Sequence, residues 1–158
     1  MRWIIPMTLA SLLCFIAPSD SLLAEPYSPH SGVKLIETTI PFDNFTERLT
    51  GAISKNKMGL VAQACANCGA KSIGVTIPGN RVFMIFRPDF AVRMLAASEA
   101  AGVEAPLRLY VTEQSDGTAR LSYRLPSHVF GAYEVADLDR LGAELDVILA
   151  QIAQDALQ

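Results

Sequence analysis

LRLYVTEQSDGTARLSYRL, residues 107–125, alternates apolar and polar side chains on both sides of a short polar turn. Such alternation is typical of two antiparallel strands that bury one face. A three-residue loop, Ser115-Asp116-Gly117, with glycine at the left-handed position, places Val111 opposite Leu121 on the core side. A two-residue Asp-Gly turn would place Thr112 opposite Leu121 and mix the faces, so the three-residue loop is predicted.

The predicted register also decides which side chains of the hairpin face outward. The outward pairs are Arg108 with Arg124, Tyr110 with Ser122, and Thr112 with Arg120. Like charges directly opposite each other on a sheet are unfavourable, so something should offset the pair of arginines. The alternatives are splaying into solvent at the open end of the hairpin, a carboxylate such as Glu104 or Glu134, a partner subunit, or an anionic ligand. The hydroxyl groups of the Tyr110–Ser122 pair would supply donors to such a ligand.

The segments on either side of the hairpin predict a small α+β domain. Strands are expected at residues 32–38, 60–62 and 81–86, and the last of these is apolar on both faces, as in a central strand covered on both sides. Helices are expected where apolar residues recur at spacings of three and four, with Asp43 and Asp137 as candidate caps. The three apolar stripes are Phe42, Phe45, Leu49, Ala52 and Ile53; Phe90, Met94, Ala97 and Ala101; and Leu138, Leu141, Leu145, Ile148 and Ile152. The resulting order is β-α-β-β-β-β-α, with an inserted helix after the third strand, and we expect the helices on one face of the sheet.

The N-terminus predicts export. Residues 1–24 have the three parts of a secretory signal peptide, and their apolar run is too short for a comfortable membrane span. A lipid anchor on Cys14 and an uncleaved N-terminal anchor are the alternatives. Residues 25–32 read as a flexible tether, and residues 33–158 suit a single domain. We therefore expect a periplasmic or secreted protein without stable membrane insertion after cleavage.

The charge of the chain argues against a nucleic-acid partner. The formal net charge is −3, and it stays −3 when Arg2 and Asp20 leave with the signal peptide. A phosphate backbone is normally met by a basic patch, and the sequence shows no such cluster.

CANCG, residues 65–69, holds the two cysteines that remain after signal cleavage. In an oxidising compartment, Cys65 and Cys68 can form a local disulfide without further chemistry. A Cys-x-x-Cys between a strand and a helix is also the geometry of thiol oxidoreductases, although the residues after it favour a helix poorly. Zinc needs about four ligands, and beyond the cysteines the mature chain offers only His30 and His128, so no metal and no cofactor is expected. Covalent c-type haem is excluded because Gly69 stands where histidine is required.

Several motifs together resemble the bacterial family called domain of unknown function 302. The motifs are Gly74-Val75-Thr76-Ile77-Pro78-Gly79-Asn80-Arg81, then Phe86-Arg87-Pro88-Asp89 opening a helix, Ala105-Pro106, Val111-Thr112-Glu113, and Asp116-Gly117. The resemblance covers nearly all of the mature chain. It implies a TBP-like α+β fold with a curved antiparallel sheet, and members that look like dimers. It implies no activity, and the cysteine pair is not part of the family's pattern.

Two classes of function remain after these observations. The leading interpretation is a non-enzymatic binding or interaction protein that forms a homodimer and could take a small anionic ligand. The alternative is thiol-disulfide redox or metal handling through Cys65 and Cys68. His128 is interpreted as a loop or interface histidine rather than a general base, because the sequence fixes no catalytic partner near it.

Overall fold

The computed structural model describes residues 29–158, so the expected signal peptide and most of the tether lie outside the described residues. The strands are β1 Val33–Pro41, β2 Gly59–Cys65, β3 Asn80–Phe86, β4 Leu107–Glu113 and β5 Thr118–Arg124. The helices are α1 Phe42–Lys55, α2 Ala66–Ser72, α3 Pro88–Ala97, α4 Pro126–Gly131 and α5 Ala136–Leu157, with a 3₁₀ helix η1 at Glu99–Glu104. None of the helices within residues 29–158 is long and apolar enough to cross a membrane.

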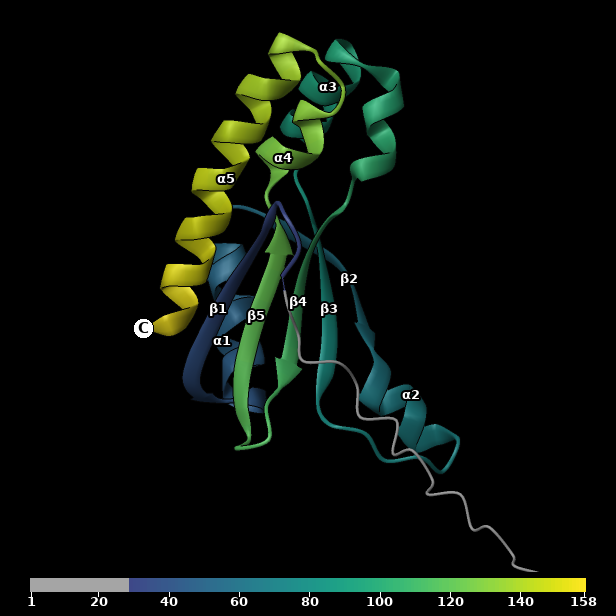
Figure 1. Cartoon of the computed structure of the whole chain (residues 1–158), viewed down its shortest axis with the longest axis vertical. Coiled ribbons are helices and arrows are strands. Elements are labelled where there is room, and N and C mark those ends of the chain that lie inside the picture. Colours follow the sequence, from purple (N-terminus) through teal and green to yellow (C-terminus); the bar gives the residue numbers. More distant parts are fainter. Residues whose placement is uncertain (1–28) are drawn as a thin grey trace, which may run out of the picture.

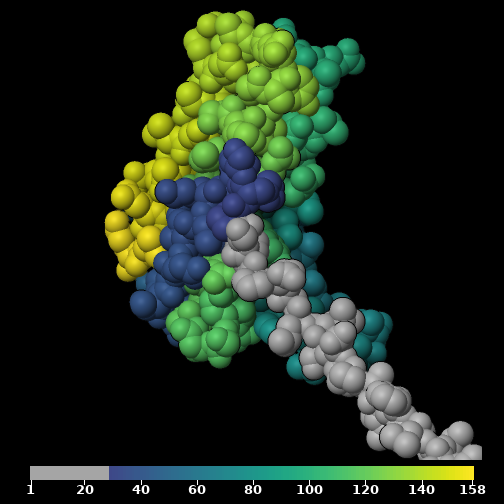
Figure 2. Space-filling view, in the orientation of Figure 1, coloured from purple at the N-terminus to yellow at the C-terminus, as the bar shows by residue number. Residues whose placement is uncertain are grey.

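The five strands form one antiparallel sheet in the order β1-β5-β4-β3-β2. The predicted α+β class is therefore confirmed, with α3 as the helix inserted after the third strand. Figure 1 shows the strands in front of α1, with α5 along one side and with α3 and α4 at one end. In Figure 2, α5 (yellow) forms one flank of the molecule, and β1 (dark blue) lies near it. The more specific likeness to a TBP-like fold stays an expectation.

The hairpin has the predicted register. Val111 pairs with Leu121, and Leu109 pairs with Tyr123. Gly117 has a φ of 82°, and the Gln114 N–H donates to the Thr118 carbonyl at 2.8 Å across the loop. A three-residue loop therefore sets which side of each strand meets the core.

The core lies between the sheet and the apolar stripes of the helices. All five predicted residues of the α1 stripe are buried, and so are Leu109, Val111 and Leu121 from the hairpin. In α5, Leu138, Leu141, Leu145 and Ile152 are buried as predicted, and Leu149 is buried in place of Ile148. The inner face of the sheet is thus sealed by α1 and α5.

Two predictions about the ends and faces of elements are wrong. Asp43 and Asp137 do not cap their helices, because these begin one residue earlier, at Phe42 and Ala136. Both aspartates lie instead in the first helical turn, where a negative charge is still favourable. β3 is covered on one face only: Phe83 and Ile85 are buried, whereas the alternate residues are half-buried on the other face.

A contact between α1 and β3 closes one corner of the fold. The ring of Phe42 lies where a side chain at position 79 would stand, since a Cβ on Gly79 would approach the ring to 2.6 Å. Gly79 is held in place by Glu113, whose side chain accepts from the Gly79 N–H at 2.6 Å and whose own N–H donates to the Gly79 carbonyl at 2.8 Å. The Phe42 N–H donates to the Gly117 carbonyl at 3.1 Å, so the same corner reaches the hairpin loop.

We expect Gly79→Ala to destabilise the protein by about 1–3 kcal/mol, because the buried Phe42 ring has to move. The measurement is urea unfolding followed by circular dichroism. Gly69→Ala is the matched control, since a Cβ there meets nothing within 4 Å. Equal stability of the two variants would contradict the role given to this contact.

The C-terminal end of α5 is tied to the C-terminal end of α1 by Asp155. Its carboxylate accepts from Lys55 Nζ at 2.8 Å and from Asn56 Nδ2 at 2.7 Å. These hydrogen bonds hold the pKa of Asp155 below its usual value, and the one from Lys55 has the larger effect. A depressed carboxyl pKa stabilises the folded state above the usual value of about 3.9, and this contribution is lost as the pH falls through the lowered pKa.

We expect Asp155→Asn to make the free energy of unfolding depend less on pH in the acid range. The free energy of unfolding of the wild type should fall on going from neutral pH to below pH ~4, and the variant should lose less over the same range. Urea unfolding at a series of pH values measures this, with Glu47→Gln on the exposed side of α1 as the control. A variant profile that runs parallel to that of the wild type would show that Asp155 makes no such contribution.

Candidate functional site

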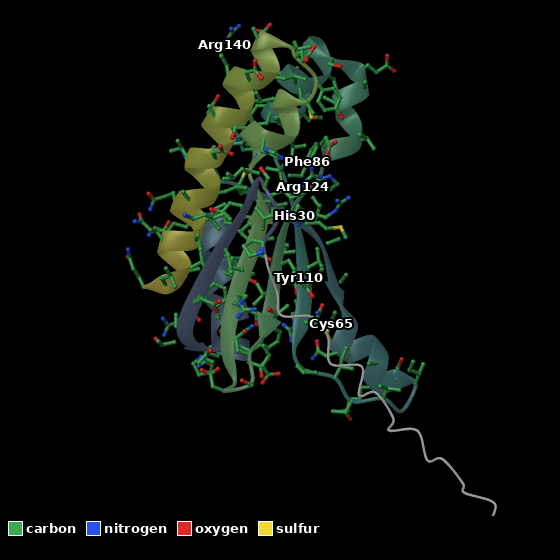
Figure 3. The ribbon with its side chains drawn as sticks, in the orientation of Figure 1. His30, Cys65, Phe86, Tyr110, Arg124 and Arg140 are labelled. Atoms are coloured by element: carbon green, nitrogen blue, oxygen red, sulfur yellow. A yellow bond between two sulfur atoms is a disulfide. The ribbon has the colours of Figure 1, made fainter. Side chains whose placement is uncertain are left out.

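The sheet face turned away from α1 and α5, here called the open face, gathers the outward side chains of all five strands. Across the middle of the sheet, Leu35, Ser122, Tyr110, Val82 and Ala64 form one row, each paired with its neighbours in the ladder. A second row, toward α4, contains Val33, Arg124, Arg108, Met84 and Ala62. A third row, toward the hairpin loop, contains Glu37, Arg120, Thr112 and Asn80. The open face is therefore largely apolar along its middle row and at its β2 edge, with Arg108 on β4 and Arg120 and Arg124 on β5. Figure 3 looks onto this face, with Arg124 near its α4 end and Tyr110 farther along the strands.

The two arginines expected to oppose each other lie just beyond the last paired rung of the hairpin. The ladder between β4 and β5 ends at Leu109–Tyr123, and Arg108 and Arg124 flank that rung. Arg124, whose side chain is 57% exposed, has Glu104 as a partner at 3.9 Å, one of the two carboxylates expected from the sequence. An exposed ion pair at this distance is weak. Arg108 is exposed and has no ion-pair or hydrogen-bond partner among residues 29–158.

The hydroxyl groups beside these arginines differ in accessibility. Tyr110 is half-buried, and its Oη accepts a hydrogen bond from Asn80 Nδ2 at 2.5 Å. Ser122 lies across the ladder from Tyr110 as predicted, but it is only 5% exposed. Tyr110 is thus the more available of the two donors. The sequence placed Asn80 only in the family-like motif of residues 74–81, and the alignment of β3 with β4 places it beside Tyr110.

The cysteine pair lies outside the open face, where β2 leaves the sheet. Cys65 and Cys68 form a disulfide, with their Cα atoms 5.2 Å apart. The Cys68 N–H donates to the sulfur of Cys65 at 3.2 Å, and α2, which follows, contains no buried residue. Arg81 pairs with Cys65 in the ladder between β2 and β3. The disulfide therefore closes a turn in an exposed segment, and Arg81 occupies the position opposite Cys65 on the neighbouring strand.

The two histidines do not join the cysteines. The ring of His128 in α4 packs on Gly32, where an added Cβ would lie 2.1 Å from the ring, and Gly32 itself has a φ of 79°. His30 is exposed, and its carbonyl accepts from the Val33 N–H. Within residues 29–158 no three or more His, Cys, Asp or Glu side chains gather closely enough to hold a metal ion.

Four of the motif residues, Gly79, Arg81, Glu113 and Gly117, gather around Phe42, whereas Asn80 and Thr112 of the same motifs lie on the open face. Gly79 and Glu113 form two hydrogen bonds with each other, and the carbonyl of Gly117 accepts the N–H of Phe42. The guanidinium of Arg81 lies 5.7 Å from the centroid of the Phe42 ring and 3.8 Å from Asp43. Their contacts fasten α1 to the sheet, so we interpret this set as structural.

Comparison with known proteins gives a family and a fold. A family model described as "Domain of unknown function DUF302" matches residues 35–156. A crystal structure of an uncharacterized conserved DUF302 protein from Bacillus stearothermophilus is similar to the chain, with 17% sequence identity and a TM-score of 0.72. The similarity covers 80% of this chain and 99% of that chain, and at this identity it shows the fold alone. No curated protein matches the sequence.

Proposed function

The chain belongs to the DUF302 family, and we propose that it is an exported, non-enzymatic binding domain that forms a homodimer and holds an anionic ligand on the open face of its sheet. We infer the ligand from one observation. Arg108 is exposed and has no partner among the described residues, and it lies near Tyr110 and Arg124 on a partly apolar surface. The family's description names no activity, so the proposal is built from this surface.

Charge and chemistry favour an anion at this place. The chain as a whole has a formal charge of −3, yet among residues 29–158 the strands of the open face present Arg108 and Arg124 in addition to the ion-paired Arg120 and Glu37. Glu37 is already bonded to Arg120 at 2.8 Å, and Glu104 is 3.9 Å from Arg124. Guanidinium groups bind carboxylate and phosphate oxygens through charge-assisted hydrogen bonds, which are stronger beside apolar groups than in open water.

The groups on this surface also explain why we propose binding rather than catalysis. Arginine and asparagine side chains donate hydrogen bonds that hold and orient a ligand, and neither is a nucleophile. The Asn80 amide fixes the phenol of Tyr110 through its hydrogen bond, which prepares a rigid contact beside Arg108. A preorganised donor loses less conformational entropy when it binds.

We expect phosphate and sulfate to raise the melting temperature of the wild type by about 3–6 °C at a concentration near ten times the dissociation constant. Arg108→Ala and Arg124→Ala should lose most of this rise, since each removes a guanidinium from the open face. The measurement is thermal unfolding at constant ionic strength, with chloride as the reference anion.

Arg48→Ala is the matched control, because it removes an exposed arginine from α1, on the other side of the sheet. Sulfate and phosphate also stabilise proteins through exclusion from the surface, and the control measures that general effect. Equal shifts in Arg108→Ala and Arg48→Ala would contradict the anion site.

A second candidate function is thiol-disulfide exchange through Cys65 and Cys68. The observation that favours it is that their disulfide lies in a segment without buried helical residues, with Cys68 exposed and Arg81 paired with Cys65. In such an exchange, a partner dithiol would give two electrons and two protons, leaving the partner as a disulfide and this pair as two thiols. A cation beside Cys65 would favour its thiolate once the bond is reduced.

The reduction potential separates this candidate from a structural disulfide. We expect a structural bond, with a potential below about −300 mV, whereas exchange proteins lie between about −270 and −120 mV. The measurement is equilibration with dithiol–disulfide buffers, acid quenching, alkylation and mass spectrometry. A potential inside the exchange range, lost in Cys68→Ser, would replace the binding proposal with the redox one.

A further inference from the structure

The two edges of the sheet are protected to different degrees. β1, at one edge, carries Lys34 and Glu37 and ends at Pro41, and its register shifts between Glu37 and Pro41. Charges, prolines and bulges are the devices that keep an edge strand from pairing with another chain. β2, at the other edge, contains neither a charged residue nor a proline. Its one irregularity lies between Leu60 and Ala62, so Ala62 to Cys65 form a regular ladder with β3.

The segment that follows β2 also contains few charged residues. Residues 58–70 form the longest uncharged run in residues 29–158, and from 58 to 80 Lys71 is the only charged residue. We call residues 66–78 the arm, and Figure 1 shows α2, with the chain that follows it, projecting beyond the rest of the described residues. Loss of charge is the compositional signal that marks the centre of a protein–protein interface.

The arm and β2 also expose large apolar side chains. Ile73 is 77% exposed and Val61 is 55% exposed, and Val75 and Ile77 are exposed as well. Ile73, Val75 and Ile77 lie close together in sequence after α2, and Val61 lies on the edge strand β2 itself. Large apolar side chains are also exposed elsewhere, at Val92, Leu95, Val103, Val147 and Leu157. What distinguishes this segment is that its exposed apolar side chains stand where Lys71 is the only charged residue, a composition that favours an interaction site.

We propose that the occupant of this edge is a second copy of the chain, with β2 of one protomer pairing antiparallel with β2 of its partner. This inference rests on the homodimer of the proposed function and gives that dimer its interface. A two-fold interface brings the same surface together with itself, so any charge on it meets its own kind. The uncharged β2 avoids this repulsion, which matters for a chain whose formal charge is −3.

The small side chains of β2 make close approach feasible. Ala62, Gln63 and Ala64 are exposed, so two such strands can reach the spacing of neighbouring strands without moving bulky groups. The Cys65–Cys68 disulfide then fixes the direction in which the arm leaves the strand. In this arrangement the sheets of both protomers join into one, and the apolar residues of each arm lie beside the junction.

The experiment compares the oligomeric state of the protein without its signal peptide with that of two lysine variants. Ala64→Lys places a charge on β2, and Thr39→Lys places the same charge at an exposed position of β1. By sedimentation velocity we expect a wild-type dimer, a dissociation constant weakened about fivefold or more in Ala64→Lys, and no change in Thr39→Lys. Circular dichroism and urea unfolding check that both variants are folded.

Hydrogen exchange gives a second readout that does not depend on a variant. The backbone amides of residues 60–65 should exchange more slowly at concentrations above the dissociation constant than below it. A wild-type monomer at high micromolar concentration would overturn this inference and the homodimer together, while leaving the anion site intact. A wild-type dimer that Ala64→Lys does not weaken, or whose β2 amides gain no protection, would overturn the edge pairing alone.

Discussion

The position of the Phe42 ring over Gly79 is the constraint on which the rest of the structure depends. It fixes the first turn of α1 against the start of β3. Glu113 on β4 forms two hydrogen bonds with the same glycine, and the carbonyl of Gly117 in the hairpin loop accepts the Phe42 N–H. Helix, strands and turn are therefore joined at one corner of the fold. Because α1 is set there, its buried residues and those of α5 all cover the same face of the sheet. The open face, which neither helix covers, presents Arg108, Arg120 and Arg124.

The local part of the fold could be predicted from the sequence, and the non-local part could not. The hairpin register followed from strict alternation and loop length, both of which act over a few residues, and it placed Tyr110 opposite Ser122 as observed. The strand order was not predictable, because it depends on pairings between segments that are distant along the chain. Nor could the half-buried Val82, Met84 and Phe86 of β3 be told from a fully buried strand, since both have the same apolar composition.

The candidate site shows the same division. Arg108 and Arg124 were found because they flank a predictable rung, and Glu104 was among the carboxylates expected to offset them. Asn80 was missed as a partner of Tyr110, because its hydrogen bond joins two strands whose alignment is set by tertiary packing. The burial of Ser122 was also missed, since it depends on how closely the neighbouring strands press on a small side chain.

The motif residues around Phe42 and the residues that could give the chain a function lie in different places, with Asn80 beside Tyr110 as the exception. Gly79, Glu113 and Gly117 hold α1 on the sheet, so membership of the family accounts for the fold without indicating a ligand. The cysteines stand instead at the root of an arm whose helix has no buried residue and which the core therefore cannot position. A disulfide in such a segment supplies locally the rigidity that packing supplies elsewhere. What it stabilises is the geometry of an uncharged edge and of the apolar residues beyond it, and a rigid exposed surface of that composition favours interaction over chemistry.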